Sequence, residues 1–405
     1  MEYSFEIVNG ILITIITGIL ASWFYLLVYM LKSFRQSPKL QCYDSSVSHN
    51  TPKISVILPA RNEEKYIARC LDSILKQDYI NFEIIAVNDS STDRTGVIIQ
   101  QFARKSPKIV AVSAGPAPVG WVGKNWACFQ GYLKATGDIF LFTDADTVHS
   151  PYIMSLAVGH LIQQDLDAIT AIPRLLCLDF WTKITLPLLS IFLHTQFSAL
   201  RVNDPKSKTG YFFGSFFVIT RGIYEKVGTH KAVKHEFVED GALGKKVKQE
   251  KFRMKMVRGE HYIDAIWARN LNTLWHGLRR LVIPLYSQNK NKTFLMSVAV
   301  FFLLFVPFLL IPYSLVSFTI STSIDLLIAR ILLYVIIATD ILILLTNAIQ
   351  SRLALFQNPI YALGSPASGA IISLSFISSI IDAKKIGAVN WRNRIYTVKE
   401  NQNPL

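Results

Sequence analysis

Residues 7–31 form an apolar stretch without one charged side chain, and no other feature limits the possible folds of this chain as strongly. A helix of this length crosses the hydrocarbon core of a bilayer. Acidic residues precede the stretch at positions 2 and 6, and basic residues follow it at positions 32, 35 and 39. The positive-inside rule therefore predicts an N-terminus outside the cell and a following domain in the cytoplasm. A cleaved signal peptide is disfavoured, because it would have a basic start and a shorter apolar core.

Three further apolar segments lie toward the C-terminus, at 293–320, 326–345 and 360–381. Three complete crossings there would carry the tail at 383–405 outside, although this tail is basic and should stay inside. We therefore expect one segment to be re-entrant. Glycine, proline and serine suit a broken or dipping helix, so the composition predicts that residues 360–381 form it. The chain is expected to be a multi-pass protein of the cell membrane.

The composition agrees with membrane segments around a soluble middle. Hydrophobic residues make up 51% of the chain, and its mean hydropathy is +0.32. The basic flanks of membrane segments and their attraction to anionic headgroups explain the formal net charge of +14. No nucleic-acid motif is visible, so we expect no nucleic-acid partner. The cysteines lack ligand spacing and indicate reduced cytosolic thiols, at Cys42, Cys70, Cys128 and Cys177.

Between the apolar ends, short apolar runs alternate with helical patterns. After a polar linker that ends near residue 51, strands are predicted at 53–59, 82–87, 109–112 and 138–142. Helices are predicted between them, at 63–77, 93–105 and 124–136. This alternation predicts an α/β fold with a parallel sheet and right-handed crossovers. Such sheets bind ligands at the carboxyl ends of their strands, and the polar clusters of this sequence occur there.

Asp144 and Asp146 follow the apolar run 139–142 directly. A strand that delivers two carboxylates to its carboxyl end can hold a divalent cation, and that cation keeps positions open for phosphate oxygens. The pair therefore points to a nucleotide-diphosphate substrate. An isolated pair of this kind is equally compatible with a solvated turn.

Two more polar clusters follow predicted strands. In the first, Pro59 shapes the turn and Arg61 can pair with phosphate or base edges. Glu63 or Glu64 in the same cluster favours the start of the next helix through the helix dipole, and the whole cluster also reads as an ordinary capped helix start. In the second cluster, Asp89 can accept a hydrogen bond from a nucleobase or from a ribose hydroxyl.

Two candidate sites lie farther along the chain. Lys124, in the Gly-rich loop 120–126, is placed to neutralise phosphate near a helix N-terminus. The loop lacks the spacing of a P-loop, which disfavours an ATPase. Glu239 and Asp240 either begin a helix or act as paired carboxylates, in which mutual repulsion raises one pKa toward a working value.

Five motifs in this order resemble the family 2 glycosyltransferases of GT-A fold. They are Pro59-Ala60-Arg61-Asn62-Glu63-Glu64, the run from Asn88 to Asp93, Gly123-Lys124, Asp144-Ala145-Asp146 and Glu239-Asp240-Gly241. The similarity extends from about residue 52 to about residue 285. It implies an inverting transfer of sugar from a UDP- or GDP-sugar.

The resemblance also implies a role for each matching residue. Asp240 corresponds to the catalytic base, which takes the proton of the acceptor hydroxyl opposite the leaving group. Asp144 and Asp146 would bind Mg²⁺ or Mn²⁺ on the diphosphate. His261 would supply a further metal ligand or a phosphate contact, with a structural role as the alternative. The substrate-binding set is Pro59, Ala60, Arg61, Glu63, Asp89, Lys124, Asp144 and Glu239.

Two stretches, 120–128 and 391–396, resemble the membrane-bound transferases associated with hopanoids and carotenoids and, more distantly, ceramide glucosyltransferases. This resemblance implies a lipid acceptor, although Asn393 stands where the pattern has glycine. The Gln/Arg-x-x-Arg-Trp run of processive synthases is absent downstream, which favours transfer of a single sugar. Polyprenyl phosphate is the alternative acceptor. A non-catalytic membrane subunit that binds nucleotide sugar is the alternative outside enzymes.

The predicted organisation has five parts. Residues 1–51 hold a transmembrane helix and a linker, and residues 52–265 form the cytoplasmic GT-A glycosyltransferase domain. Residues 266–292 form an amphipathic, basic helix that lies in the membrane interface, with a core helix of the soluble domain as the alternative. Residues 293–382 hold the transmembrane and re-entrant segments, and residues 383–405 form a basic cytoplasmic tail.

Overall fold

Two compact units make up the chain. The computed structural model describes residues 2–41, 51–321, 324–385, 388–391 and 394–397. Unit 1 contains Met1–Arg35, Cys177–Thr195 and Ala268–Gly387, and unit 2 contains Gln36–Leu176, Gln196–Trp267 and Ala388–Leu405. The domain predicted at 52–265 is thus interrupted by a segment of unit 1. Cys42 and parts of the predicted linker and basic tail lie outside the described residues.

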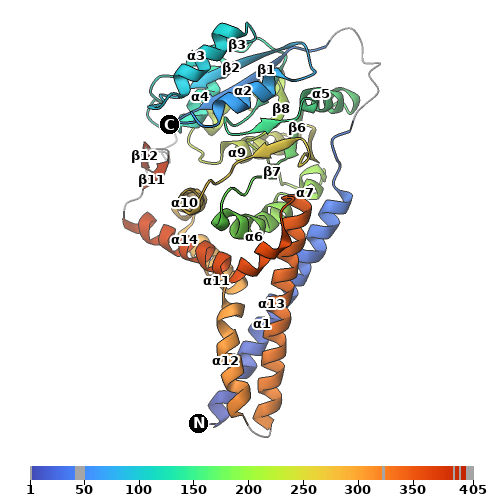
Figure 1. Ribbon diagram of the computed structural model, residues 1–405, viewed down its shortest axis with the longest axis vertical. Helices are drawn as coiled ribbons and strands as arrows, with labels where there is room; N and C mark the ends of the chain where they lie inside the picture. The colour runs from blue at the N-terminus through green and yellow to red at the C-terminus, as the bar shows by residue number, and fades with distance from the viewer. Residues whose placement is uncertain (1, 42–50, 322–323, 386–387, 392–393, 398–405) are drawn as a thin grey trace. The chain divides into compact units, whose positions relative to one another are not determined.

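Unit 2 is built on a mixed sheet of seven strands in the order β3-β2-β1-β4-β8-β6-β9 (Figure 1). Most neighbours are parallel, as predicted, but β8 runs antiparallel to both β4 and β6. Between β7 and β8 the chain passes through α6 (Phe180–Gln196) and α7 (Ala199–Asn203), so β8 does not follow the single crossover that would make it parallel to its neighbours. The strands are β1 (Ile54–Ala60), β2 (Phe82–Asn88), β3 (Ile109–Ser113), β4 (Ile139–Phe142), β6 (Ala168–Ile172), β8 (Phe217–Thr220) and β9 (Met254–Arg258).

Helices bury both faces of this sheet. Because successive side chains of a strand point to opposite faces, Val56 and Leu58 join one core, whereas Ile57 joins the other. A strand covered on both sides reads as a continuous apolar run, which is why these strands could be located from sequence. One face is covered by α2 (Ile67–Leu75), α3 (Thr95–Lys105) and α5 (Ile153–Gln163), and the other by α4 (Gly123–Tyr132), α7 (Ala199–Asn203), α8 (Arg221–Lys226) and α9 (Glu239–Gln249).

The register of the parallel strands sets the position of the polar clusters. Ala60 pairs with Asn88, and Ile57 pairs with Phe142, so the chain segments that leave β1, β2 and β4 do so at one edge of the sheet. A small sheet of β5 (Val148–His149), β10 (Ile263–Ala265) and β7 (Arg174–Leu175) also belongs to unit 2. The 3-10 helix η1 (His230–Val233) leads toward α9, and β11 (Ala388–Trp391) pairs with β12 (Arg394–Thr397).

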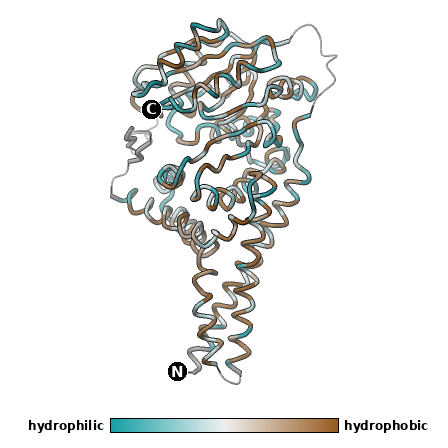
Figure 2. The backbone as a smooth tube through the Cα atoms, viewed as in Figure 1, coloured by the Kyte–Doolittle hydropathy of each residue, from teal (hydrophilic) through white to brown (hydrophobic). Residues whose placement is uncertain are grey.

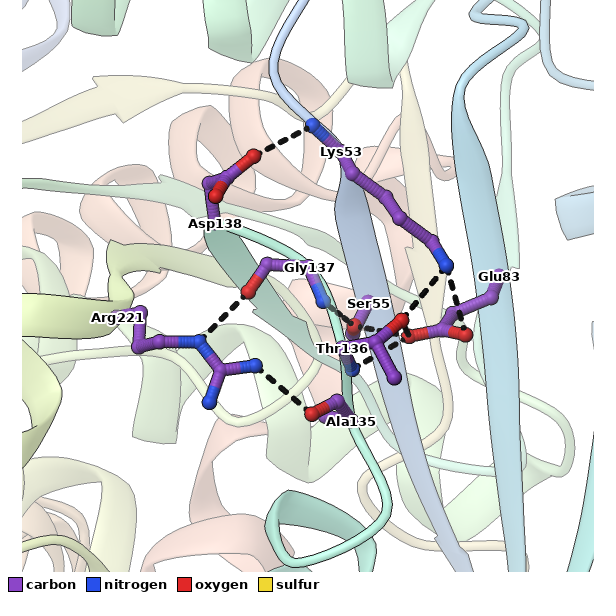
Figure 3. Close-up of polar contacts among 8 residues, drawn as sticks. All are labelled: Lys53, Ser55, Glu83, Ala135, Thr136, Gly137, Asp138 and Arg221. Atoms are coloured by element: carbon purple, nitrogen blue, oxygen red, sulfur yellow. Dashed lines mark hydrogen bonds and ion pairs between the residues drawn. The ribbon is translucent and has the colours of Figure 1, made fainter.

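The amino edge of the same sheet is held by a closed polar network (Figure 3). Glu83 lies at its centre and accepts hydrogen bonds from the Ser55 hydroxyl at 2.6 Å and from the Thr136 backbone at 2.7 Å. Lys53 forms an ion pair with the other carboxylate oxygen of Glu83 at 3.1 Å. Arg221 donates to the carbonyl oxygens of Gly137 and Ala135, both at 2.8 Å. The network fixes the connection between α4 and β4.

Unit 1 contains the apolar helices. Three helical stretches are long and apolar enough to cross a membrane, Glu6–Gln36, Asp325–Ala354 and Pro359–Lys384, and their hydrophobic colouring is plain in Figure 2. Asn9 of α1 donates to Ser317 of α12, and α12 packs on α13. The helices are α1 (Glu2–Gln36), α6 (Phe180–Gln196), α10 (Leu271–Gln288), α11 (Lys290–Leu304), α12 (Val306–Ile320), α13 (Ile324–Ala354), η2 (Pro359–Gly364) and α14 (Ser365–Lys385).

The structure corrects the position of the break in the apolar segments. Residues 365–385 form the unbroken helix α14, whereas α11 and α12 are bent by 51° against each other. Pro307 has no N–H for the carbonyl of Leu303, so one helical hydrogen bond is missing at the bend. The indole of Trp23 donates to that carbonyl instead, at 2.9 Å. In α14, the proline occupies the first turn, where its missing N–H costs nothing.

The predicted amphipathic helix is observed as α10, which begins at a capping box between Asn270 and Thr273. Its apolar side chains Leu274 and Leu278 are fully buried within unit 1. Both α10 and α11 pack on α14, and Arg279 of α10 forms an ion pair with Asp382 of α14 at 2.6 Å. In Figure 1, α14 runs across the direction of α12 and α13 rather than beside them.

Candidate active site

Lys124 connects two of the predicted carboxylates at the carboxyl edge of the sheet. It lies in the first turn of α4, and its ammonium group is 2.8 Å from the Asp144 carboxylate and 2.6 Å from the Glu239 carboxylate. Asp144 follows β4, and Glu239 is the first residue of α9. Although burial disfavours its charged form, the carboxylates of Asp144 and Glu239 raise the pKa of Lys124 well above its usual value.

Asp240 is partly buried beside this cluster and is held by two backbone donors. The N–H of Gly214 donates to Oδ2 at 2.6 Å, and the N–H of Gly241 donates to Oδ1 at 2.8 Å. Desolvation, and then the charge of Glu239, raises the pKa of Asp240 to about 7. The Cα of Gly214 is so close that a Cβ there would be 2.7 Å from the Asp240 carboxylate and 3.1 Å from the Lys124 ammonium. Only glycine leaves this arrangement undisturbed.

Asn125 ties the segment before α9 to the start of α4. This side chain is fully buried, and its amide nitrogen donates to the carbonyl oxygens of Val233 at 2.7 Å and Glu236 at 2.9 Å. The N–H of Val122 makes a third connection, to the carbonyl oxygen of Lys234 at 2.7 Å. These bonds bring together the two segments that carry Lys124 and Asp240.

The segments after β1 and β2 also bind each other. The guanidinium of Arg61 donates to the carbonyl oxygens of Asp89 at 2.7 Å and Ser90 at 2.8 Å, and Asp89 is buried. Pro59 and Ala60 are the last two residues of β1. The structure therefore brings Arg61 and Asp89 together, in an arrangement where Arg61 supports the loop after β2.

The helix predicted to begin at Glu63 begins four residues later, at Ile67. Glu63 is buried in the turn before it, where its N–H donates to Thr95 at 2.7 Å. The carbonyl oxygen of Glu63 accepts from the N–H groups of Tyr66 and Ile67, both at 2.9 Å, so Glu63 and Glu64 lie at the start of α2 and their helix-dipole role stays a prediction. The side chain of Glu64 also accepts from the backbone of Arg94.

The three predicted metal ligands do not form one group. Asp144 and Asp146 are partly exposed next to each other after β4, whereas His261 is exposed in the turn between β9 and β10. Within the described part of the chain, no three His, Cys, Asp or Glu side chains gather in a way that could hold a metal ion. Two partly exposed carboxylates fit a cation whose remaining ligands are phosphate oxygens.

A buried histidine behind the acidic pair was not singled out from the sequence. Nε2 of His149 lies 3.1 Å from the Thr143 hydroxyl, which donates to the carbonyl oxygen of Ser215 at 2.8 Å. Burial lowers the pKa of His149 to about 4, so the ring is neutral near neutral pH. This chain of contacts connects the residue before Asp144 with the residue after Gly214. No spacing in the sequence indicates it.

Comparisons with known proteins match part of this chain to one family. Residues 55–228 match the family model described as Glycosyl transferase family 2. A 4,4'-diaponeurosporenoate glycosyltransferase of Staphylococcus aureus strain MRSA252 is 27% identical over 203 residues, which are 49% of this chain and 52% of the relative. The protein of the same name from strain N315 is 26% identical over 208 residues, 50% of this chain and 53% of the relative. The chain thus spans about half the length of these relatives.

A solved structure with the same fold covers more of the chain. It is a mannosyltransferase from Pyrobaculum calidifontis in complex with GDP-Man and Mn²⁺, and it is similar over 92% of this chain and 99% of its own. The TM-score is 0.53 at 18% sequence identity, so the likeness is one of fold. The matched family, the mixed α/β sheet and this likeness agree with one another. Residues 55–228 of this chain therefore match the family 2 glycosyltransferases, and the chain has the GT-A fold.

Proposed function

We propose that this protein transfers a single sugar from a nucleotide-diphospho-sugar to a hydroxyl group of a membrane lipid, with inversion at the anomeric carbon. The observation that carries the proposal is the desolvated Asp240 carboxylate, held by two backbone N–H groups beside Lys124, Asp144 and Glu239. A base with a pKa of about 7 is suited to take a proton near neutral pH.

In this proposal, Asp240 takes the proton of the acceptor hydroxyl while the hydroxyl oxygen attacks the anomeric carbon. The bond from that carbon to the diphosphate breaks on the opposite face. Lys124 stays protonated because of its raised pKa and offers positive charge to the departing diphosphate. A divalent cation, Mg²⁺ or Mn²⁺, would be held by Asp144 and Asp146 and would add positive charge there. Arg61 and Asp89 border the part of the edge where the nucleoside would lie.

A membrane location supports the lipid acceptor. Three crossings, through α1, the bent α11–α12 pair and α13, would leave the C-terminal tail on the side of unit 2 if α14 lies in the interface. The basic residues after α1 and in the tail favour the cytoplasm for that side. The name of the Staphylococcus aureus relatives, 4,4'-diaponeurosporenoate glycosyltransferase, further supports a lipid acceptor.

The test is mass spectrometry of lipids from membranes that contain the protein, supplied with UDP- and GDP-sugars and with Mn²⁺ or Mg²⁺. We expect one lipid to gain a single sugar mass with wild type and with the control Asp165→Asn, whose side chain is 83% exposed. Asp240→Asn, Asp144→Ala and Asp146→Ala should lose this product. Full activity in Asp240→Asn would overturn the assignment of Asp240 as the catalytic base.

Two other outcomes point to the alternatives. A product on polyprenyl phosphate with only a mild loss in Asp240→Asn would favour the polyprenyl-phosphate sugar synthase, because an anionic acceptor needs little help from a base. No product with any donor from folded wild-type protein would favour a non-catalytic subunit that binds nucleotide sugar.

A further inference from the structure

An open, apolar groove of about 420 Å³ lies between α13 and η2 in unit 1. No polar side chain contributes to its lining, which comes from Ile341, Leu345 and Ala348 of α13 and from Pro359, Ile360 and Leu363 of η2, among others. Ile360 and Leu363 are 61% and 69% exposed, so the described part of the chain leaves most of their surface uncovered. The lining residues of α13 extend over about 10 Å of helix length. This length suits part of an extended hydrocarbon chain.

A lysine contacts η2, which forms one wall of this groove, through Tyr361. Nζ of Lys183, on α6, is 3.5 Å from the Tyr361 hydroxyl and 5.2 Å from the centre of its ring. The backbone of Lys183 is fixed as well, because Gln357 donates to its carbonyl oxygen at 2.9 Å. Tyr361 stands between two residues of the groove wall, Ile360 and Ala362. The ammonium group is therefore held through Tyr361 against η2, the element that forms one wall of the groove.

Lys183 lacks an acidic partner. Across the residues that the structure describes, no carboxylate lies within ion-pair distance of its ammonium group. Asp179 directly precedes α6 and caps this helix instead. It accepts hydrogen bonds from the backbone and the hydroxyl of Thr182, at 2.8 and 2.7 Å. A half-buried ammonium group without an anion is a site for one.

We propose that the groove and Lys183 together bind one anionic membrane lipid, with the hydrocarbon chain along α13 and the phosphate headgroup at Lys183. The wholly apolar lining excludes a polar peptide, and α13 is one of the helices long and apolar enough to cross a membrane. The unpaired ammonium group selects an anionic headgroup over a zwitterionic one. This lipid is distinct from the acceptor and is held rather than glycosylated. The proposal rests on the membrane location argued above, but not on sugar transfer.

Native mass spectrometry of the purified, delipidated full-length protein tests the proposal. The probes are phosphatidylglycerol and phosphatidylcholine with identical acyl chains, added in detergent without any sugar donor. Wild type should retain phosphatidylglycerol about fivefold better than phosphatidylcholine. Lys183→Gln should abolish this preference, whereas Lys183→Arg should keep it. Ala348→Phe should reduce the retention of both lipids, because the new ring fills the groove.

Lys290→Gln is the matched control, because Lys290 is an exposed lysine of the same unit, outside the groove. It should behave like wild type. Equal retention of both lipids by wild type, or an unchanged preference in Lys183→Gln, would overturn the proposal, and so would an equal loss in Lys290→Gln. If Lys183→Gln does not fold, the other two variants still test the proposal. Loss of the preference in Lys183→Arg, or unchanged retention of both lipids in Ala348→Phe, would contradict it. A protein that shows the preference but transfers no sugar refutes the proposed function alone.

Discussion

The two edges of the sheet in unit 2 use similar residues for opposite purposes. At the amino edge, Glu83 accepts several hydrogen bonds and pairs with Lys53. Although partial burial acts against it, hydrogen bonds from Ser55 and Thr136 lower the pKa of Glu83. At the carboxyl edge, Lys124 is shared between two carboxylates, and the pKa of Asp240 is raised to about 7. A satisfied carboxylate stabilises the fold, whereas a crowded one is ready to accept a proton.

The difference comes from the supply of donors. Glu83 receives a hydroxyl, a backbone N–H and an ammonium group around one carboxylate. The carboxyl edge gathers Asp144, Glu239 and Asp240 around a single ammonium group, and Asp240 receives two backbone N–H groups. A ligand that brings new positive charge or takes a proton would relieve this excess of carboxylates.

Among variants that test the difference between the two edges, Gly214→Ala should have the largest effect on activity. The new Cβ would meet the ends of the Asp240 and Lys124 side chains, which can move without disturbing the fold. We expect kcat to fall about 100-fold, which is a usual loss when a catalytic base is displaced, with little change in melting temperature. Steady-state kinetics and thermal unfolding measure the two quantities. Gly222→Ala is the control, because nothing lies within 4 Å of its Cβ position. Wild-type kcat in Gly214→Ala would contradict the assigned geometry.

The pH dependence of kcat/KM should show the raised pKa of Asp240 directly. Asp240 acts as a base only when it is deprotonated, so kcat/KM should fall about tenfold for each pH unit below pH 7. Lys124 should add no alkaline limb near neutral pH, because its pKa is raised. A profile measured from pH 5 to 9 with folded protein checks both statements. A rate that stays constant down to pH 5 would remove Asp240 as the base.

Asn125→Ala should separate positioning from simple stability. Loss of the bonds from Asn125 to the segment before α9 should lower kcat about tenfold and shift the acidic limb of the pH profile, because Asp240 moves relative to Lys124. Asn203→Ala is a matched control: this side chain also connects backbone segments, with bonds of 2.9 and 2.7 Å to Met256. Both variants should lose similar stability. If Asn125→Ala has the same pH profile as wild type, the role of Asn125 is only structural.

The smallest effect on activity is expected at the amino edge. Glu83→Gln removes the charge that pairs with Lys53 and should lower the free energy of unfolding by about 1–3 kcal/mol. Because the pKa of Glu83 is lowered in the folded state, its stabilisation is present above the carboxylate's unfolded pKa and is lost as the pH falls through the folded value. Chemical denaturation at pH 7 and pH 4 should therefore differ less for the variant. A specific loss of kcat would mean that the two edges are coupled.

The sequence predicted β1, β2, β3 and β4 and the charged residues that gather around Lys124, but it did not predict β6, β8 and β9. β1, β2 and β4 are buried on both faces and read as short apolar runs, and the charged residues follow them or begin a helix. Lys124 could therefore be linked to Asp144 and Glu239 through motif order and the family resemblance. The antiparallel direction of β8 could not be predicted, because the strand direction depends on a path of the chain that no local pattern encodes.

The residues that position the site were invisible for a similar reason. Asn125 bonds to carbonyl groups 108 and 111 residues away, and Thr143 bonds to a carbonyl group 72 residues away. Backbone carbonyl groups belong to every residue type, so the partner leaves no mark in the sequence. Gly214 is explained only by the side chains that approach it in space. Among the described residues, His261 does not gather with Asp144 and Asp146 into one group, although β10, which follows it, pairs with β5 directly after the acidic pair.

Residues 177–195 belong to unit 1 although they stand between two stretches of unit 2. During synthesis, α6 leaves the ribosome long before its partner Gln350, which lies 160 residues beyond the Ser190 hydroxyl that it binds. The apolar helix α6 is therefore synthesised before β8 and β9, which complete the sheet. Its apolar surface is exposed at this stage, which favours early contact with the membrane or a chaperone. A fragment trimmed only to residues 36–267 would carry this helix without Gln350 and Ser368. A water-soluble version of the sheet unit therefore requires residues 177–195 to be replaced by a short linker.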